Sequence, residues 1–169
     1  ALLHGLAPRA SEGMRVLDVG CNRGLLLLAA RRLGWEPVGV ELSPVAAAQA
    51  REATNAPVYA DLAHVPRRGG FDLVVAWHVL EHTTDPITFL TRMKGLLARD
   101  GMLAIQVPSF EHADEFRRQG RLGSLVCAVH NLQFTKQTLS DTLRRAGFDV
   151  RSVVDADLML TAVAEHPAQ

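Results

Sequence analysis

Strand-like and helix-like patterns alternate along this sequence. Seven short apolar runs predict strands, and the run FDLVVA is apolar throughout, which is typical of a strand covered on both faces. The predicted strands are residues 14–20, 37–41, 56–60, 71–76, 102–107, 148–154 and 158–164. The predicted helices between them are residues 23–34, 44–54, 85–98 and 135–146. This order allows few architectures, because consecutive parallel strands are joined by helical crossovers.

Turn residues mark the ends of several elements. Ser43 is the expected N-cap of the second helix, with Pro44 at its first helical position. Gly34 and Gly147 are expected to end the first and last helices. The tight segment Asp155–Asp157 is expected to join the last two strands into a hairpin. The sequence therefore predicts an α/β fold with a doubly wound, seven-stranded sheet, mostly parallel, with one antiparallel strand from the C-terminal hairpin.

The length of the chain, 169 residues, suits one domain with one core, so residues 1–169 are predicted to form a single domain. Residues 109–134 mix glycines and arginines without a sheet pattern. They predict a partly helical insertion of a size often found in active-site lids.

Charge and hydropathy exclude several classes of partner. Lysine plus arginine number 18 and aspartate plus glutamate also number 18, so no overall positive field is expected to attract nucleic acid or anionic lipid. The longest apolar stretch, residues 25–30, is far shorter than the roughly 20 residues of a membrane span, and no signal-peptide pattern opens the sequence. We therefore expect a cytoplasmic protein with a small-molecule partner and no nucleic-acid or membrane partner.

The two cysteines, Cys21 and Cys127, lie far apart in the sequence. Neither has a second Cys or His at metal-ligand spacing, so the expectation is two reduced thiols, no disulfide and no metal site.

A glycine-rich turn follows the first predicted strand, with Asp18, Gly20, Asn22 and Gly24 in alternate positions. Such a turn lets the backbone approach a ligand and directs helix N–H groups at a negative group. The dinucleotide fingerprint fails here, because its second and third glycines are replaced by Asn22 and Leu25. A turn that serves only strand–helix packing is the plain alternative.

Two acidic residues follow the next predicted strands. Glu41 ends the second strand, where a carboxylate can accept both hydrogens of a ribose diol, although it could also be a helix-entry acid. Asp61 follows the third strand, and by itself would be an ordinary loop acid.

The stretch Trp77–Pro86 contains a Val-Leu-Glu-His motif followed by Asp-Pro. Together with the Asp18, Gly20 and Gly24 turn, it resembles the class I S-adenosylmethionine-dependent methyltransferase superfamily, of the small-molecule type that carries the VLEH motif. Further landmarks of that type appear in order across residues 14–164: Leu96–Gly101, Val107–Pro108, His130, Phe134–Thr135 and Gly147–Phe148. The resemblance implies a Rossmann-like fold, with S-adenosylmethionine as cofactor and S-adenosylhomocysteine as its product.

The resemblance also implies a cofactor site. In it, Glu41 meets the ribose, Asp61 meets the adenine amino group, and Leu42 and Leu62 pack on the faces of the adenine ring. The implied cofactor-binding residues are Asp18, Gly20, Cys21, Asn22, Gly24, Glu41, Leu42, Asp61, Leu62 and Trp77. Asn22 departs from the glycine of the family pattern, but asparagine tolerates positive φ and can keep the turn. Trp77 can face the sulfonium through a cation–π contact or serve as a core aromatic.

Methyl transfer from a sulfonium depends mainly on alignment, with a base needed when the acceptor must lose a proton. Imidazole is a base suited to neutral pH, so His82 and His130 are the candidate catalytic residues. Each has a structural alternative: His82 can hold the turn after the fourth strand, and His130 can attach the 109–134 segment to the core.

The sequence therefore predicts an S-adenosylmethionine-dependent methyltransferase that acts on an oxygen, nitrogen or carbon nucleophile of a small molecule. The main alternative is a catalytically silent S-adenosylmethionine-binding protein that serves as the partner of another subunit. An NAD oxidoreductase ranks third. The sequence leaves the oligomeric state open.

Overall fold

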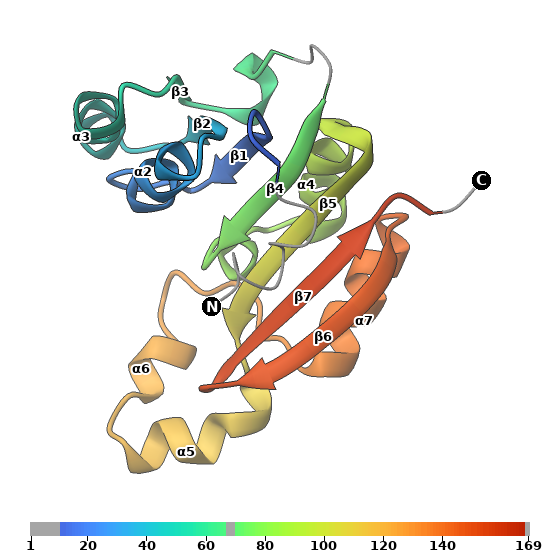
Figure 1. Cartoon of the computed structure of the whole chain (residues 1–169). Coiled ribbons are helices and arrows are strands. Elements are labelled where there is room, and N and C mark those ends of the chain that lie inside the picture. The colour runs from blue at the N-terminus through green and yellow to red at the C-terminus, as the bar shows by residue number, and fades with distance from the viewer. Residues whose placement is uncertain (1–10, 67–69, 168–169) are drawn as a thin grey trace.

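The computed structural model describes residues 11–66 and 70–167, which form a seven-stranded sheet with helices on both faces (Figure 1). The strands are β1 (Arg15–Val19), β2 (Glu36–Val40), β3 (Val58–Tyr59), β4 (Phe71–Trp77), β5 (Leu97–Pro108), β6 (Asp149–Ala156) and β7 (Met159–Glu165). The helices are α2 (Leu25–Arg32), α3 (Pro44–Thr54), α4 (Pro86–Lys94), α5 (Ala113–Arg118), α6 (Leu122–Leu125) and α7 (Lys136–Arg145). Three short 3-10 helices are η2 (Leu62–His64), η3 (Leu80–His82) and η4 (Phe110–His112).

The strand order is β3-β2-β1-β4-β5-β7-β6. The pairs β1–β2, β1–β4, β2–β3 and β4–β5 are parallel, and β7 runs antiparallel to both of its neighbours. The chain therefore starts in the middle of the sheet, builds one half, crosses over at β4 and ends with the hairpin (Figure 1). The predicted Rossmann-like class, with one antiparallel strand, is confirmed.

Alternation along the strands divides the core between the two faces of the sheet. Leu17 and Val74 belong to the larger cluster, which includes apolar side chains of α4 and α7. Val16 and Val75 belong to a second cluster, with Leu26 of α2. This arrangement follows from the period of two in a strand, which sends successive side chains to opposite faces.

Local signals at the helix ends are confirmed. The Ser43 side chain accepts a hydrogen bond from the N–H of Ala46, with Pro44 at the first helical position. Thr135 caps α7 in a capping box with Thr138. Such caps satisfy N–H groups that have no partner inside the helix.

The helix predicted over 85–98 begins as expected but ends at Lys94, so its predicted end is wrong. Leu97 instead pairs with Phe71 and begins β5, and the register shifts before the next pair. Gly101 allows this irregularity, because a Cβ there would lie 2.5 Å from the carbonyl oxygen of Phe71.

The terminal hairpin also turns later than predicted. β6 continues through Ala156, and the turn consists of Asp157 and Leu158, with φ of 53° and 67°. Positive φ at both central residues is the geometry whose twist matches a two-residue hairpin. A leucine in this position carries no sequence signal for such a turn.

The 109–134 segment contains η4, α5 and α6 and lies beyond the carboxyl ends of β4 and β5 (Figure 1). It buries Phe116 and Leu125. Its two ends meet in a bridge between Ser109 and Phe134. The predicted partly helical character is confirmed, while its role as a lid stays a prediction.

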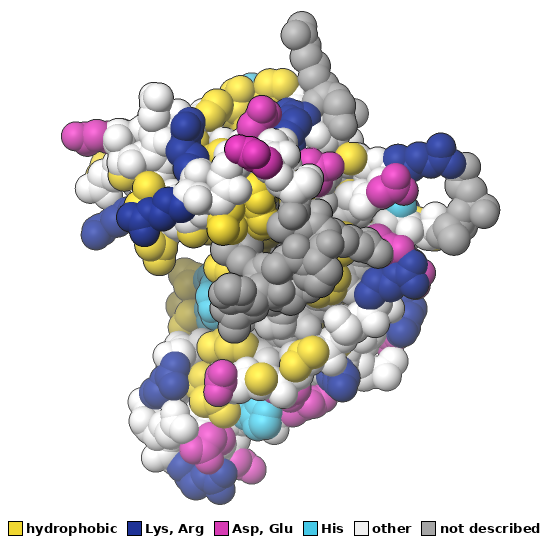
Figure 2. Space-filling model, in the orientation of Figure 1, with side chains coloured by type: hydrophobic (Ala, Val, Ile, Leu, Met, Phe, Trp, Pro, Cys, Tyr) yellow, Lys and Arg dark blue, Asp and Glu magenta, His cyan; other side chains and the backbone are white. Residues whose placement is uncertain are grey.

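Basic, acidic and hydrophobic side chains are interspersed on the face shown in Figure 2. Within residues 11–66 and 70–167, no helix is long and apolar enough to cross a membrane.

Candidate active site

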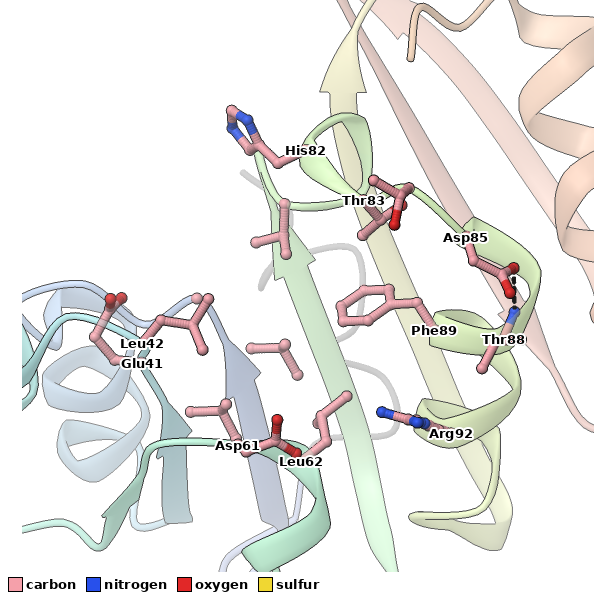
Figure 3. A pocket seen from close by; sticks show the side chains of 15 residues that line it. Glu41, Leu42, Asp61, Leu62, His82, Thr83, Asp85, Thr88, Phe89 and Arg92 are labelled. Carbon is pink, nitrogen blue, oxygen red and sulfur yellow. Dashed lines mark hydrogen bonds between the residues drawn. The ribbon is translucent and has the colours of Figure 1, made fainter. Parts of the chain in front are cut away.

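A pocket of about 530 Å³ opens where β1, β2 and β4 end. One wall comes from the segments after β2 and β3, and the opposite wall from η3 and α4 (Figure 3). This is the edge at which open parallel sheets bind ligands. The lining residues are Val19, Gly20, Val40, Glu41, Leu42, Asp61, Leu62, Val79, His82, Thr83, Thr84, Asp85, Thr88, Phe89 and Arg92.

The turn after β1 has the backbone that its glycines predict. Gly20 and Gly24 have φ of 78° and 83°, and Asn22 adopts φ of 48°, so the asparagine keeps the turn. A Cβ at Gly20 would lie 2.5 Å from Cγ2 of Val79, the residue before η3, so any other residue at this position would require the valine side chain to shift. Gly20 lines the pocket, whereas Asn22 and Gly24 do not line it.

The Glu41 carboxylate links this turn to the start of α3. Its two oxygens accept the backbone N–H groups of Asn22 at 2.9 Å and of Ser43 at 2.8 Å. A carboxylate offers about four acceptor positions, so the side chain retains capacity for a ribose diol. Glu41 lines the pocket, in the place that the resemblance implied.

Asp18, in β1, and Cys21, in the turn after it, are buried and do not line the pocket. Asp18 is only 5% exposed, and burial, aided by the Glu41 carboxylate, raises its pKa from 3.8 to about 7. Burial, together with the carboxylates of Asp18 and Glu41, raises the pKa of Cys21 to about 12. Cys21 and Cys127 are both free thiols, as expected.

Two leucines and an aspartate form one end of the pocket. Leu42 is 79% exposed and Leu62 is buried. Asp61 caps η2 by accepting the N–H of Ala63 at 2.7 Å. All three line the pocket and project into it as Figure 3 shows.

The wall formed by α4 was missed by the sequence interpretation. Phe89 and Arg92 project from this helix toward the loops that carry Leu42 and Asp61 (Figure 3). Thr88 also lines the pocket. The signal was available, because Asp85, Thr88, Phe89 and Arg92 follow the spacing of a single helix face.

Trp77 and His130 are not among the residues that line the pocket. The indole of Trp77 packs against the cluster that contains Leu73 and Val75. Its N–H is buried and has no hydrogen-bond partner within the described part of the chain. This position favours the core role of Trp77 over the sulfonium contact.

His82 lies at one end of the pocket (Figure 3). It also contacts the 109–134 segment. Its Nδ1 lies 2.8 Å from the carbonyl oxygen of Val129, and its ring packs edge-on against His130 with 4.7 Å between centroids. Nδ1 of His130 lies 3.0 Å from the carbonyl oxygen of Leu125. The structure therefore brings the two candidate histidines together.

A family model and curated relatives both identify this chain as similar to methyltransferases. A family model described as "Methyltransferase domain" matches residues 1–153. The Ubiquinone biosynthesis O-methyltransferase of Cereibacter sphaeroides (strain ATCC 17023) is 37% identical over 106 residues, which cover 57% of this chain and 42% of that protein. The protein of the same name from Rhodopseudomonas palustris (strain HaA2) is 33% identical over 106 residues, with 56% and 40% covered. The chain thus matches about two fifths of the length of these relatives.

Solved structures share the fold at low identity. A putative methyltransferase in complex with the Haloferax volcanii Trm112 activator is 19% identical, with a TM-score of 0.80, covering 99% of this chain and 89% of that one. Magnesium protoporphyrin IX methyltransferase from Synechocystis PCC 6803, with bound S-adenosylhomocysteine, is 18% identical, with a TM-score of 0.75, covering 98% and 80%.

The match of the family model to most of the sequence confirms the predicted enzyme class, and S-adenosylmethionine as its cofactor. The contacts assigned above to individual cofactor-binding residues stay predictions. The chain belongs to the methyltransferase domain family, within the class I S-adenosylmethionine-dependent superfamily.

Proposed function

We propose that this chain transfers the methyl group of S-adenosylmethionine to a hydroxyl oxygen of a small molecule. The observation that carries the proposal is the placement of His82 beside a partly apolar pocket, with its Nδ1 against a carbonyl oxygen. A carbonyl can only accept, so Nδ1 holds a proton, and in the neutral form of the ring Nε2 keeps a lone pair. The names of the relatives, which specify O-methylation, agree with a hydroxyl acceptor.

The cofactor is proposed to occupy the end of the pocket formed by Glu41, Leu42, Asp61 and Leu62. Glu41 would accept the ribose hydroxyls and Asp61 the adenine amino group, while the leucine side chains cover the ring. Phe89 on α4 offers an apolar surface opposite Leu42. A cofactor held in this way would have its methyl group in the part of the pocket near His82.

The reaction that this arrangement supports is an in-line displacement. The acceptor hydroxyl loses its proton, and its oxygen forms a bond to the methyl carbon while the carbon–sulfur bond breaks. The electron pair of the broken bond stays on sulfur, so the sulfonium becomes the neutral thioether of S-adenosylhomocysteine. The protein contributes alignment and assistance to proton loss.

His82 can assist proton loss in two ways. The lone pair on its Nε2 can take the proton of the acceptor hydroxyl directly, or it can hold a metal ion that makes this hydroxyl more acidic. Both ways require His82 at the acceptor end of the pocket.

The test is incubation of the chain with methyl-labelled S-adenosylmethionine and a set of small hydroxylated acceptors. We expect labelled product and S-adenosylhomocysteine in equal amounts. His82→Ala should lower turnover by about 10²- to 10⁴-fold with cofactor affinity nearly unchanged. His64→Ala, at an exposed position in η2, is the matched control and should retain turnover.

Cofactor binding without labelled product from any acceptor would support the alternative of a silent partner subunit. A neighbour of this fold is described in complex with an activator, so the same assay should be repeated with candidate partner proteins. Label transfer to nitrogen or carbon, with none to oxygen, would refute the choice of acceptor atom.

A further inference from the structure

We propose that Glu81, His82 and His130 bind a divalent transition-metal ion at the acceptor end of the pocket. One possible ligand atom from each of these residues lies within 4.8 Å of the other two. Glu81 and His82 lie in η3, and His130 lies near the end of the 109–134 segment, so the cluster joins two parts of the chain.

The Glu81 carboxylate is the strongest indication of a cation-binding site. The residue is 1% exposed, and neither carboxylate oxygen has a hydrogen-bond partner among the residues that the structure describes. The nearest cationic candidate is His78, whose half-exposed ring places Nδ1 3.4 Å from Oε1. Burial of a carboxylate without compensation is expensive, and a bound cation would supply that compensation.

Both histidines are oriented as metal-bound histidines usually are. Nδ1 of His82 faces the carbonyl oxygen of Val129, and Nδ1 of His130 faces that of Leu125. Each Nδ1 must therefore carry a hydrogen, and in the neutral form of the ring this leaves a lone pair on Nε2. Hydrogen bonding from the second ring nitrogen to a backbone carbonyl is the arrangement that fixes the tautomer and orientation of a metal-binding imidazole.

Further hydrogen bonds hold the two parts of the chain together at this site. The Asn131 side chain donates a hydrogen bond to the backbone carbonyl oxygen of His82 at 2.7 Å. The backbone N–H of Leu132 donates one to the backbone carbonyl oxygen of Glu81 at 3.0 Å. The cluster is thus anchored by backbone contacts on both sides before any ion binds.

The donor set selects the type of ion. Two imidazole nitrogens and one carboxylate oxygen suit zinc, iron(II) and similar ions, whereas Mg²⁺ and Ca²⁺ prefer oxygen ligands. Three protein ligands leave at least one coordination position for another molecule. His82 also lines the pocket, so that position can take the acceptor hydroxyl. The role toward the acceptor rests on the proposed function, whereas the binding of the ion does not.

Local spacing does not predict this site, and the expectation from the sequence is no metal site. His130 is remote from Glu81 and His82 in the sequence. Only the packing of the 109–134 segment against η3 brings the three side chains together.

The first experiment measures binding of the metal alone, without cofactor or acceptor. The purified chain is treated with a chelator, and Zn²⁺ is titrated by calorimetry, with the absorption of bound Co²⁺ as a second readout. We expect one ion per chain. His82→Ala, His130→Ala and Glu81→Gln should each weaken binding by more than about 10-fold, while His64→Ala should leave it unchanged.

A melting experiment distinguishes loss of metal binding from failure of a variant to fold. Zn²⁺ should raise the Tm of the wild type and of His64→Ala, by the linkage of binding to folding, and should raise that of Glu81→Gln by less at the same concentration. Absence of stoichiometric binding, or binding equally strong in all three cluster variants, would overturn the proposal.

Turnover then separates this inference from the proposed function. Chelation should abolish methyl transfer to the acceptor while S-adenosylhomocysteine still binds. Full turnover after removal of the metal would refute the role of the ion toward the acceptor and leave the methyltransferase activity standing. Metal binding without methyl transfer to any hydroxyl would instead refute the proposed function alone.

Discussion

The buried carboxyl of Asp18 makes the stability of this domain depend on pH in a direction that can be calculated. Its pKa is about 7 in the folded chain, against an ordinary value of 3.8 that applies when the chain unfolds. Between these pH values the folded state retains a proton that the unfolded state has lost. Stability therefore decreases as the pH rises from about 4 to about 7.

The size of the effect follows from the same two values. A tenfold change in proton affinity is worth about 1.4 kcal/mol, so the interval from 3.8 to about 7 corresponds to about 4 kcal/mol. Asp18→Asn replaces the carboxyl with a neutral group of nearly the same shape. The free energy of unfolding of the variant should match that of the wild type near pH 4 and exceed it by up to about 4 kcal/mol near pH 8.

Urea unfolding followed by tryptophan fluorescence across this pH range measures the difference directly. Asp100→Asn removes an exposed carboxylate from β5 and is the matched control, for which we expect little change. A difference between Asp18→Asn and the wild type that stays constant with pH would refute the argument. A variant less stable than the wild type near pH 8 would refute it as well.

Three further substitutions test the turn after β1, the acid after β2 and the terminal hairpin. Gly20→Ala places a Cβ 2.5 Å from Val79, and should lower stability by about 1–3 kcal/mol and weaken S-adenosylhomocysteine binding in calorimetry. Gly13→Ala has a similar positive φ of 83° but nothing within 4 Å of the added Cβ, so it should show the smaller cost of the backbone alone and normal binding. Glu41→Ala should weaken S-adenosylhomocysteine binding by about 10-fold or more, because hydrogen bonds to charged groups contribute about 1.5–3 kcal/mol each, and NAD should bind to neither variant nor wild type. Leu158→Gly relieves a positive φ of 67° and should raise the Tm by about 2–4 °C in a melting experiment, and a lower Tm would show that the turn is not strained.

The succession of strands and helices and most helix ends could be predicted, because their signals are local. Ser43, Pro44 and Thr135 act within one helical turn of their own positions, so the sequence alone reveals them. Where the structure differs, a distant residue decides. The end of α4 is set by the pairing of Leu97 with Phe71, which no local pattern records.

The candidate site was predictable in part for the same reason. Glu41, Asp61 and Leu62 follow strands directly, so strand topology places them at the pocket. Trp77 shares the face of Leu73 and Val75 through the period of two, so closer attention to that period would have directed it away from the pocket. The Glu81 cluster depends on tertiary packing and could not be predicted from spacing.

The hydrogen bonds between the 109–134 segment and η3 also have a thermodynamic consequence. His82 and Glu81 belong to the body of the domain, whereas His130 belongs to the segment, so any movement of the segment away from η3 separates them. A ligand that bridges η3 and the 109–134 segment stabilises the docked segment by a certain coupling free energy. Docking of the segment strengthens binding of that ligand by the same free energy. Binding at this end of the pocket and docking of the 109–134 segment on η3 are therefore coupled, so a change in one shifts the other.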